Sequence, residues 1–408
     1  MTSTAVDSQN TTGRSSSLFE QAARVFDGWT DAETGARVLR INPPGVAMFP
    51  GRFMLPYHQV QPFIDGGRRV LLRQGQDHER ARDSRGGSVL LDLTTGEVDN
   101  PFPDDCYVGS LDESSYTVIL GRRGGDGPQT VLYDLRAGKE LASIAPDDGW
   151  KNGGTILLAD SQRLVISHYQ GKPYDEPCRT HFHLLTPGEE PTVFLELEGV
   201  FGNHLMPCPT DPDLFAYNAW PAPRWDIPGV TSIAKVDGSV NYYVPLDENA
   251  PRPADFWGVR DHYVWTPDGS RIVSYLNRQP VDLSQPFNHF EFDWWLSALD
   301  WRTGEDYCAQ YPACRWGGHM QMTPDSKYIL CGGGPGFDKL YAVSVAELRE
   351  GWNEHIICSY PTTMSQGLNS DPFPYPFALP DGSGVLFNAG WPGDEHGVFL
   401  AEWPEGLR

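Results

Sequence analysis

The chain has 408 residues, with 54 acidic against 31 basic side chains and a formal net charge of -23. The length exceeds the usual limit of one hydrophobic core, so we expect several compact domains or one large repeat architecture. The negative charge argues against binding to nucleic acid or to an anionic membrane surface, and we expect neither as a partner. No oligomeric state is assigned from the sequence.

Targeting and redox signals are weak throughout the chain. Residues 1–17 are polar, and no window approaches 18 uncharged apolar residues, so we expect no targeting or membrane-spanning segment. The seven cysteines are scattered and contain no C-x-x-C pair. Such a pattern is typical of buried thiols in a cytoplasmic protein, and we predict that location.

In chain order, residues 1–17 are predicted to form a flexible segment and residues 17–26 a short helix. Residues 36–41 alternate as a strand would. From residue 63 onward, a short apolar strand, an Asp-containing turn and a second strand recur along the chain. A second short helix is predicted over residues 343–352.

The recurring turn has a near-regular period. Its aspartates are Asp65, Asp112, Asp160, Asp211, Asp268, Asp325 and Asp381. The successive steps of 47, 48, 51, 57, 57 and 56 residues are near the ~40–50 residues of a four-stranded propeller blade. We therefore predict an all-β fold, a single seven-bladed β-propeller domain over residues 18–408. Two stacked β-sandwiches would explain the strands but not the continuous period.

The strand over residues 36–41 precedes the first complete blade. We expect it to complete the last blade, because joining the two ends of the ring leaves no long exposed strand edge.

Several histidines share one phase of this repeat. His262, His319 and Tyr375 lie six residues before their turn aspartates, and His58 and His204 lie seven residues before theirs. Inner strands of a propeller run along the channel, so a shared phase predicts a ring of side chains at one mouth. For His58 and His204, either a longer turn absorbs the extra residue or the side chain points to the other face.

Clustered imidazoles can bind a divalent metal or act as a general base near neutral pH. A lone histidine is more often a hydrogen-bonded structural residue, and that interpretation holds for the histidines off the shared phase, although His181 and His183 alternate on one strand and could line the rim. The off-phase histidines include His168, His181, His183, His289, His355 and His396.

Cationic and phenolic groups matter if the ligand is an acid. Arg224 and Arg278 each follow the second strand of a predicted blade, and either guanidinium can hold a carboxylate through two hydrogen bonds. Tyr263 and Tyr375 are candidate ligand contacts or proton donors, although burial is the commoner role of a single tyrosine.

At these residues the chain resembles the oligogalacturonate lyases, seven-bladed propellers that cleave short uronic-acid oligomers by β-elimination with a divalent metal, typically manganese. The resemblance covers residues 34–41, 202–204, 262–269, 319–325 and 376–387. It implies that His262 is the general base and that His319 is a metal ligand. The family's remaining ligands come from a last-blade His-Pro-His segment and a nearby glutamine, where this chain reads Phe-Pro-Tyr-Pro at residues 373–376. The resemblance therefore implies a divergent member.

A lyase of this kind removes the proton at C5 of a uronate, α to the carboxylate, and expels the oxygen at C4. The hypothesis assigns His262 as the base, Arg224 or a cation bound by His319 as the group that neutralises the carboxylate, and Tyr375 or His204 as the donor to the leaving oxygen. The further candidate residues are His58, Arg278 and Tyr263 for substrate binding, and His319, His204 and His262 as ligands of a manganese or calcium ion.

Two alternatives stay open. One is a noncatalytic propeller that binds carbohydrate or protein at the same face, and the other is a metal-assisted glycoside or ester hydrolase. Ultraviolet absorbance separates them from a lyase, because only β-elimination creates a conjugated double bond.

Overall fold

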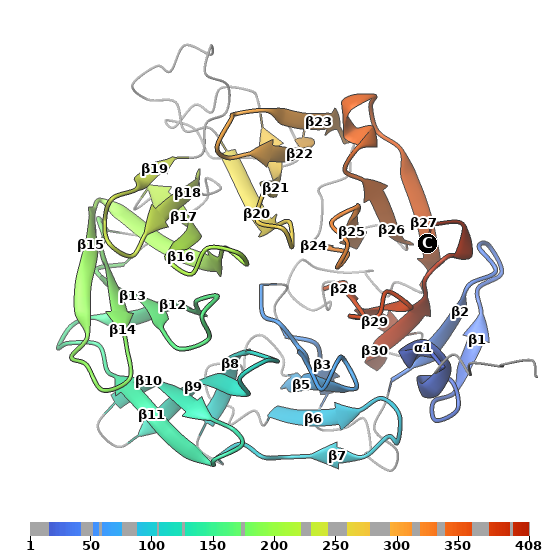
Figure 1. The fold of residues 1–408 in the computed structure, drawn as a ribbon, viewed down its shortest axis with the longest axis horizontal. Coiled ribbons are helices and arrows are strands. Elements are labelled where there is room, and N and C mark those ends of the chain that lie inside the picture. The colour runs from blue at the N-terminus through green and yellow to red at the C-terminus, as the bar shows by residue number, and fades with distance from the viewer. Residues whose placement is uncertain are drawn as a thin grey trace, which may run out of the picture.

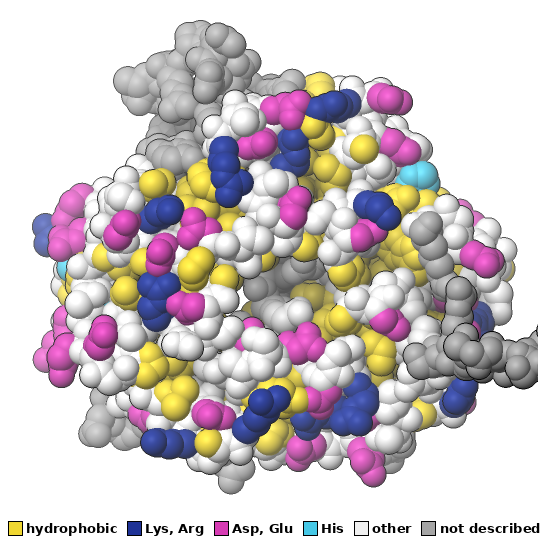
Figure 2. Space-filling view, viewed as in Figure 1, with side chains coloured by type: hydrophobic (Ala, Val, Ile, Leu, Met, Phe, Trp, Pro, Cys, Tyr) yellow, Lys and Arg dark blue, Asp and Glu magenta, His cyan; other side chains and the backbone are white. Residues whose placement is uncertain are grey.

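The computed structural model describes residues 16–41, 52–56, 59–75, 88–103, 106–124, 127–172, 176–221, 230–243, 259–277, 294–311, 319–332, 339–360, 375–391 and 395–407. They form seven antiparallel blades in a ring (Figure 1), which confirms the predicted all-β, seven-bladed propeller. Figure 2 shows that the centre of the ring is hollowed. Within the described part of the chain, no helix is long and apolar enough to cross a membrane.

Blade 1 has a divided inner strand, because β3 and β4 both pair with β5. Its strands are β3 (Arg52–Met54), β4 (Phe63–Ile64), β5 (Arg69–Gly75), β6 (Ser88–Asp92) and β7 (Val98–Asp99). Blade 2 consists of β8 (Cys106–Leu111), β9 (Thr117–Gly124), β10 (Gly127–Asp134) and β11 (Lys139–Ile144). Blade 3 consists of β12 (Lys151–Leu157), β13 (Leu164–Gln170), β14 (Arg179–Leu185) and β15 (Thr192–Glu198).

Blades 4 and 5 are linked by a short parallel bridge between β18 and β20. Blade 4 consists of β16 (Val200–Pro207), β17 (Leu214–Pro221), β18 (Val230–Lys235) and β19 (Asn241–Tyr243). Blade 5 consists of β20 (Val259–Trp265), β21 (Arg271–Asn277), β22 (Trp294–Asp300) and β23 (Asp306–Gln310). Blade 6 consists of β24 (Met320–Met322), β25 (Tyr328–Gly332), β26 (Lys339–Ser344) and β27 (Glu354–Ser359).

Blade 7 joins the two ends of the chain. Its strand order is β1-β2-β30-β29-β28, so the N-terminal strands are its outermost members. Their bounds are β28 (Phe377–Ala378), β29 (Gly384–Trp391), β30 (Glu395–Glu402), β2 (Arg37–Arg40) and β1 (Gly28–Thr30). The pairing of β2 with β30 confirms that the strand near residue 37 closes the ring.

Helical structure is slight within the described residues. The predicted N-terminal helix is present as α1 (Leu18–Ala22), which buries Phe19. The stretch predicted as a second helix contains only the 3-10 turn η2 (Glu347–Arg349), because residues 339–344 belong to strand β26. A last 3-10 turn, η3, covers Glu405–Leu407.

Each predicted turn aspartate lies between the inner and second strands of a blade. In blade 5, Asp268 accepts hydrogen bonds from the Thr266 hydroxyl (2.6 Å) and the Ser270 backbone amide (3.0 Å). Burial raises the pKa of the Asp268 carboxyl, but these hydrogen bonds outweigh it and hold the pKa below its ordinary value. The turn is therefore fixed by its own charged residue.

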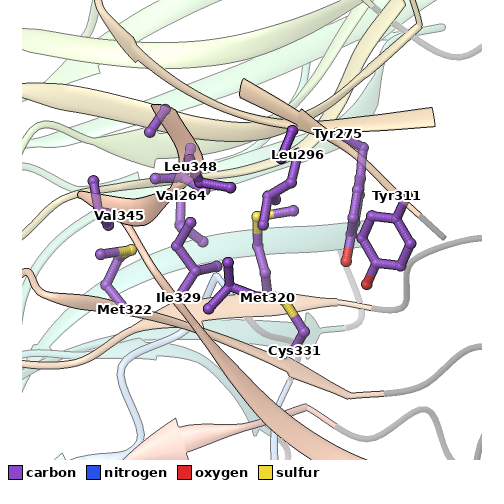
Figure 3. Packing of buried hydrophobic residues seen from close by; sticks show 14 of the residues in the cluster. Val264, Tyr275, Leu296, Tyr311, Met320, Met322, Ile329, Cys331, Val345 and Leu348 are labelled. Atoms are coloured by element: carbon purple, nitrogen blue, oxygen red, sulfur yellow. The ribbon is translucent and has the colours of Figure 1, made fainter. Parts of the chain in front are cut away.

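The core lies between neighbouring blades. One cluster between blades 5 and 6 includes Val264, Met320 and Ile329, all fully buried (Figure 3). Burying a side chain of this size contributes roughly 1.5–3 kcal/mol. Because Val264 and Met320 belong to inner strands, this core also fixes the strands that face the channel.

We expect removal of residues 1–41 to abolish the folded ring. Val38 and Ile41 are buried at 0% and 1% exposure, and their loss would uncover the edge of β30 and the apolar face beneath β2. Expression of the truncated chain should give insoluble protein by sedimentation, whereas Thr30→Ala, at an exposed position of β1, should remain soluble. A soluble truncated chain with unchanged circular dichroism would contradict this role for β2.

Candidate active site on the inner strands

Four aromatic side chains form a continuous arc across blades 4 to 7. The ring centroids of His204 and His262 lie 6.1 Å apart, those of His262 and His319 4.7 Å, and those of His319 and Tyr375 4.6 Å. The Trp220 ring extends the arc at 4.8 Å from His204. Side chains far apart in sequence are thus brought together from four successive inner strands, the convergence that the shared phase predicts.

Beta-bulges aim two of these imidazoles. The strand register shifts between Asn203 and Met206 in β16, and between Asp261 and Val264 in β20. His204 and His262 sit inside the two bulges with φ values of 49° and 48°. The left-handed region is unfavourable for residues with a Cβ atom, and such strain is concentrated at functional sites.

The extra residue before Asp211 is absorbed by the turn. In blade 5 the turn is closed by a hydrogen bond from the backbone amide of Thr266 to the carbonyl of Arg271, five residues later. In blade 4 the corresponding hydrogen bond runs from the backbone amide of Cys208 to the carbonyl of Leu214, six residues later. His204 and His262 therefore each lie four residues before the first closing residue, and both point into the arc.

Two tyrosines have different positions. Tyr263 is fully buried, and its hydroxyl donates a hydrogen bond to the His204 carbonyl, which holds the bulge of the neighbouring blade. Tyr375 is partly buried beside His319. Burial raises the pKa of the Tyr375 phenol to about 12, against the opposite effect of the Arg73 charge, so the phenol keeps its proton near neutral pH.

The blade 5–6 core supports the arc from behind. His262 lies two residues before Val264, and His319 directly precedes Met320. Val264 and Met320 both belong to the buried cluster of Figure 3. His319 itself is only 5% exposed, whereas His262 is partly exposed. His262 is therefore the more accessible of the two imidazoles.

The described residues do not fit the metal centre that the resemblance implies. Among them, no group of three His, Cys, Asp or Glu side chains has the arrangement needed to hold a metal ion. The resemblance implies last-blade ligands in the segment that contains Tyr375, and a protonated phenol is a poor ligand for manganese or calcium, which favour charged oxygen donors.

Three predicted site residues, His58, Arg224 and Arg278, lie outside the described residues, as does His289.

A second group of histidines lies in blade 3, where the sequence favoured structural roles but noted that His181 and His183 alternate on one strand. The rings of His168 and His183 are 4.5 Å apart, and Trp150 lies 4.1 Å from His181. His168 is 2% exposed, and its Nε2 has no hydrogen-bond partner within the described residues. The signal that reveals the group is strand pairing: His168 faces His181 directly across β13 and β14.

The fold is similar to that of solved structures, whereas comparisons by sequence find no match. No model of a known protein family matches the chain, and no curated protein matches it either. Among solved structures, an oligogalacturonate lyase in complex with manganese is 19% identical, with a TM-score of 0.71 over 94% of this chain and 97% of that one. An oligogalacturonate lyase from Vibrio parahaemolyticus is 15% identical, with a TM-score of 0.70 over 94% and 98%.

A propeller of another kind is less similar. The C-terminal WD40 domain of Sif2 has a TM-score of 0.51 at 11% identity, over 93% of this chain and 97% of that one. The chain therefore has a propeller fold like that of the oligogalacturonate lyases.

Backbone strain at the bulge leads to a stability prediction. At position 262 glycine adopts a φ of 48° without the Cβ penalty of alanine, a difference of roughly 1 kcal/mol. His262→Gly should therefore unfold at a higher urea concentration than His262→Ala. At Val264, which is outside the left-handed region, the order should reverse, with Val264→Gly the less stable. Equal midpoints at position 262 would mean that the bulge relaxes without the imidazole.

The blade 3 histidines predict acid sensitivity. Burial and the neighbouring His183 lower the pKa of His168 from 6.5 to about 4. Between these values the unfolded chain binds the proton and the folded chain does not, so stability falls as the pH falls, by at most about 3 kcal/mol. Urea titrations at several pH values should show a shallower decline for His168→Leu than for the wild type. The more exposed His355→Leu should keep the steep decline, and an unchanged slope for His168→Leu would contradict the assignment.

Proposed function

We propose that this chain is a lyase that cleaves a uronic-acid-containing oligosaccharide by β-elimination, as a divergent relative of the oligogalacturonate lyases. The observation that carries the proposal is the arc of His204, His262, His319 and Tyr375 in a propeller whose fold is like that of those lyases. The arc supplies a base and proton donors on neighbouring strands, as such a reaction needs.

His262 is the proposed base. It is partly exposed, whereas the adjacent His319 is almost fully buried. The edge-to-face contact between the two rings and the left-handed backbone of His262 restrict its orientation. A base held in this way can meet a C–H bond without first losing side-chain freedom.

The proton donor to the leaving oxygen is Tyr375 or His204, one on each side of the central pair. The raised pKa of Tyr375 keeps its phenol protonated and able to donate. Tyr263 is assigned to support, because its buried hydroxyl holds the His204 carbonyl. This replaces the substrate contact that the sequence suggested for it.

The proposed reaction has a simple balance. The C5 proton moves to the neutral His262 imidazole, and the electron pair of the C5–H bond forms the C4–C5 double bond. The C4–O bond breaks, and its oxygen takes a proton from the donor. No step is routed through a metal. The negative charge that grows on the uronate carboxylate requires a nearby cation, for which Arg224 and Arg278 remain candidates.

Loss of the base tests the proposal. Purified protein is mixed with a panel of uronate oligosaccharides, with added manganese, with added calcium and with a chelator, and the absorbance of the unsaturated product is followed. His262→Ala should lose on the order of 10²–10⁴-fold in turnover, the usual contribution of a positioned base.

His355→Ala is the matched control, because His355 lies outside the arc beside Glu347. It should keep wild-type turnover. Near-normal turnover by His262→Ala would place the base elsewhere. The absence of an absorbance gain on every uronate would reject the lyase, and new reducing ends without absorbance would identify a hydrolase.

A further inference from the structure

A partly buried arginine lies at the level of the arc in blade 1. Arg73 is the fifth residue of its strand β5, as Asn218, Tyr275 and Asn388 are the fifth residues of β17, β21 and β29. These are the second strands of blades 1, 4, 5 and 7. In blade 5 this position is opposite the bulge that contains His262. The register therefore places Arg73 at the same height in the ring as the histidines.

The Arg73 guanidinium is fixed in place. Its Nη2 donates to the carbonyls of Val108 and Gly109, the latter at 3.2 Å, on the inner strand β8 of the next blade. Its Nε is buried and has no hydrogen-bond partner within the described residues. A donor is thus held rigid with one of its N–H groups unused by that part of the chain.

Arg73 also differs from other arginines in its charge environment. Arg69, on the same strand, pairs with Asp65, and Arg122 pairs with Glu140. No ion pair within the described ranges includes Arg73. Burial lowers the pKa of the Arg73 guanidinium, and the phenols of Tyr107 and Tyr375 act in the opposite direction. Tyr375 is the last member of the arc, so Arg73 continues the arc on its blade 1 side.

A hydrogen bond to the inner strand of the next blade does not by itself require a charged side chain at this position. Asn388 makes the same kind of contact without one, since its Oδ1 accepts a hydrogen bond from the Leu55 amide of the next inner strand at 2.9 Å. A buried cation without a counter-ion is unfavourable, and buried charges in proteins are normally paired. Among the described residues no carboxylate forms an ion pair with Arg73, and an anionic ligand would fill that role.

We propose that Arg73 is the anchor for a carboxylate of the bound ligand, with the Tyr375 phenol beside it. This rests on the proposed function and extends it. It names a binding contact for the acidic sugar on blade 1, opposite in the arc to Trp220, and it predicts that the ligand is an anion at this end.

Binding measurements test Arg73 separately from turnover. In a His262→Ala background, calorimetric titration is carried out with trigalacturonate, with its methyl ester and with the neutral maltotriose. Adding Arg73→Gln should weaken trigalacturonate binding about 10- to 100-fold, as expected for loss of a charge-assisted hydrogen bond, and should leave the methyl ester nearly unchanged. Arg73→Lys should fall between the two.

Arg69→Gln is the matched control, because it removes a guanidinium from the other end of the same strand. It should bind trigalacturonate as the parent does. Equal losses for the acid and the ester, or no loss for either, would overturn the anchor. If the wild type turns over uronates while Arg73→Gln binds normally, the lyase stands and the anchor fails. If Arg73-dependent binding occurs without any turnover, the anchor stands and the lyase fails.

A measurement on the wild type covers the case in which Arg73→Gln does not fold or trigalacturonate does not bind. Phenylglyoxal modifies accessible guanidinium groups, and mass spectrometry reads the modification at Arg73. Galacturonate and sulfate should each slow modification of Arg73 and leave Arg69 unaffected. Modification of Arg73 at the same rate with and without both anions would overturn the proposal.

Discussion

The site depends on closure of the ring by β2 and β30. Each inner strand is held on both sides by the core between its blade and the neighbouring blades, so the positions of His204, His262 and His319 are set by their neighbours as much as by their own blades. An open ring would leave blade 7 without the buried side chains of Val38 and Ile41, and the arc would lose its Tyr375 end. The N-terminal strands therefore act on a site to which they contribute no side chain.

Within the closed ring, bulges change the direction of two side chains on the inner strands. A flat inner strand would alternate its side chains between the two neighbouring cores. A left-handed residue at His204 and at His262 turns one side chain out of this alternation. The strain is supported by neighbours: Gly154 of blade 3 packs so closely on β16 that an added Cβ would lie 2.5 Å from Leu205. Rigid packing thus keeps an unfavourable backbone in place.

The electrostatics of the molecule give the arc its chemical character. The chain carries 54 acidic against 31 basic side chains, and many of its cations are paired with carboxylates at the surface. At the level of the arc, imidazoles, a protonated phenol and a guanidinium with no ion pair among the described residues replace this pattern. An acidic ligand would meet locally favourable groups inside a molecule whose overall field opposes it.

The number of blades, their order and the phase shared by the histidines were predictable from local sequence alone. Seven turn aspartates mark the hairpins because an Asp side chain caps its own turn, an interaction confined to a few neighbouring residues. The same local spacing predicted that His204, His262, His319 and Tyr375 converge, although it left the facing of His204 open. The six-residue closure of its turn resolved that point.

The contacts of the side chains in and around the arc depend on how the blades pack against one another. This packing buried Tyr263 beneath His204, paired the blade 3 histidines across two strands, and joined Arg73 of blade 1 to the Gly109 carbonyl of blade 2. None of these contacts follows from local spacing, because each joins residues from different strands or blades. The packing of the closed ring sets their distances, and spacing along the chain does not predict them.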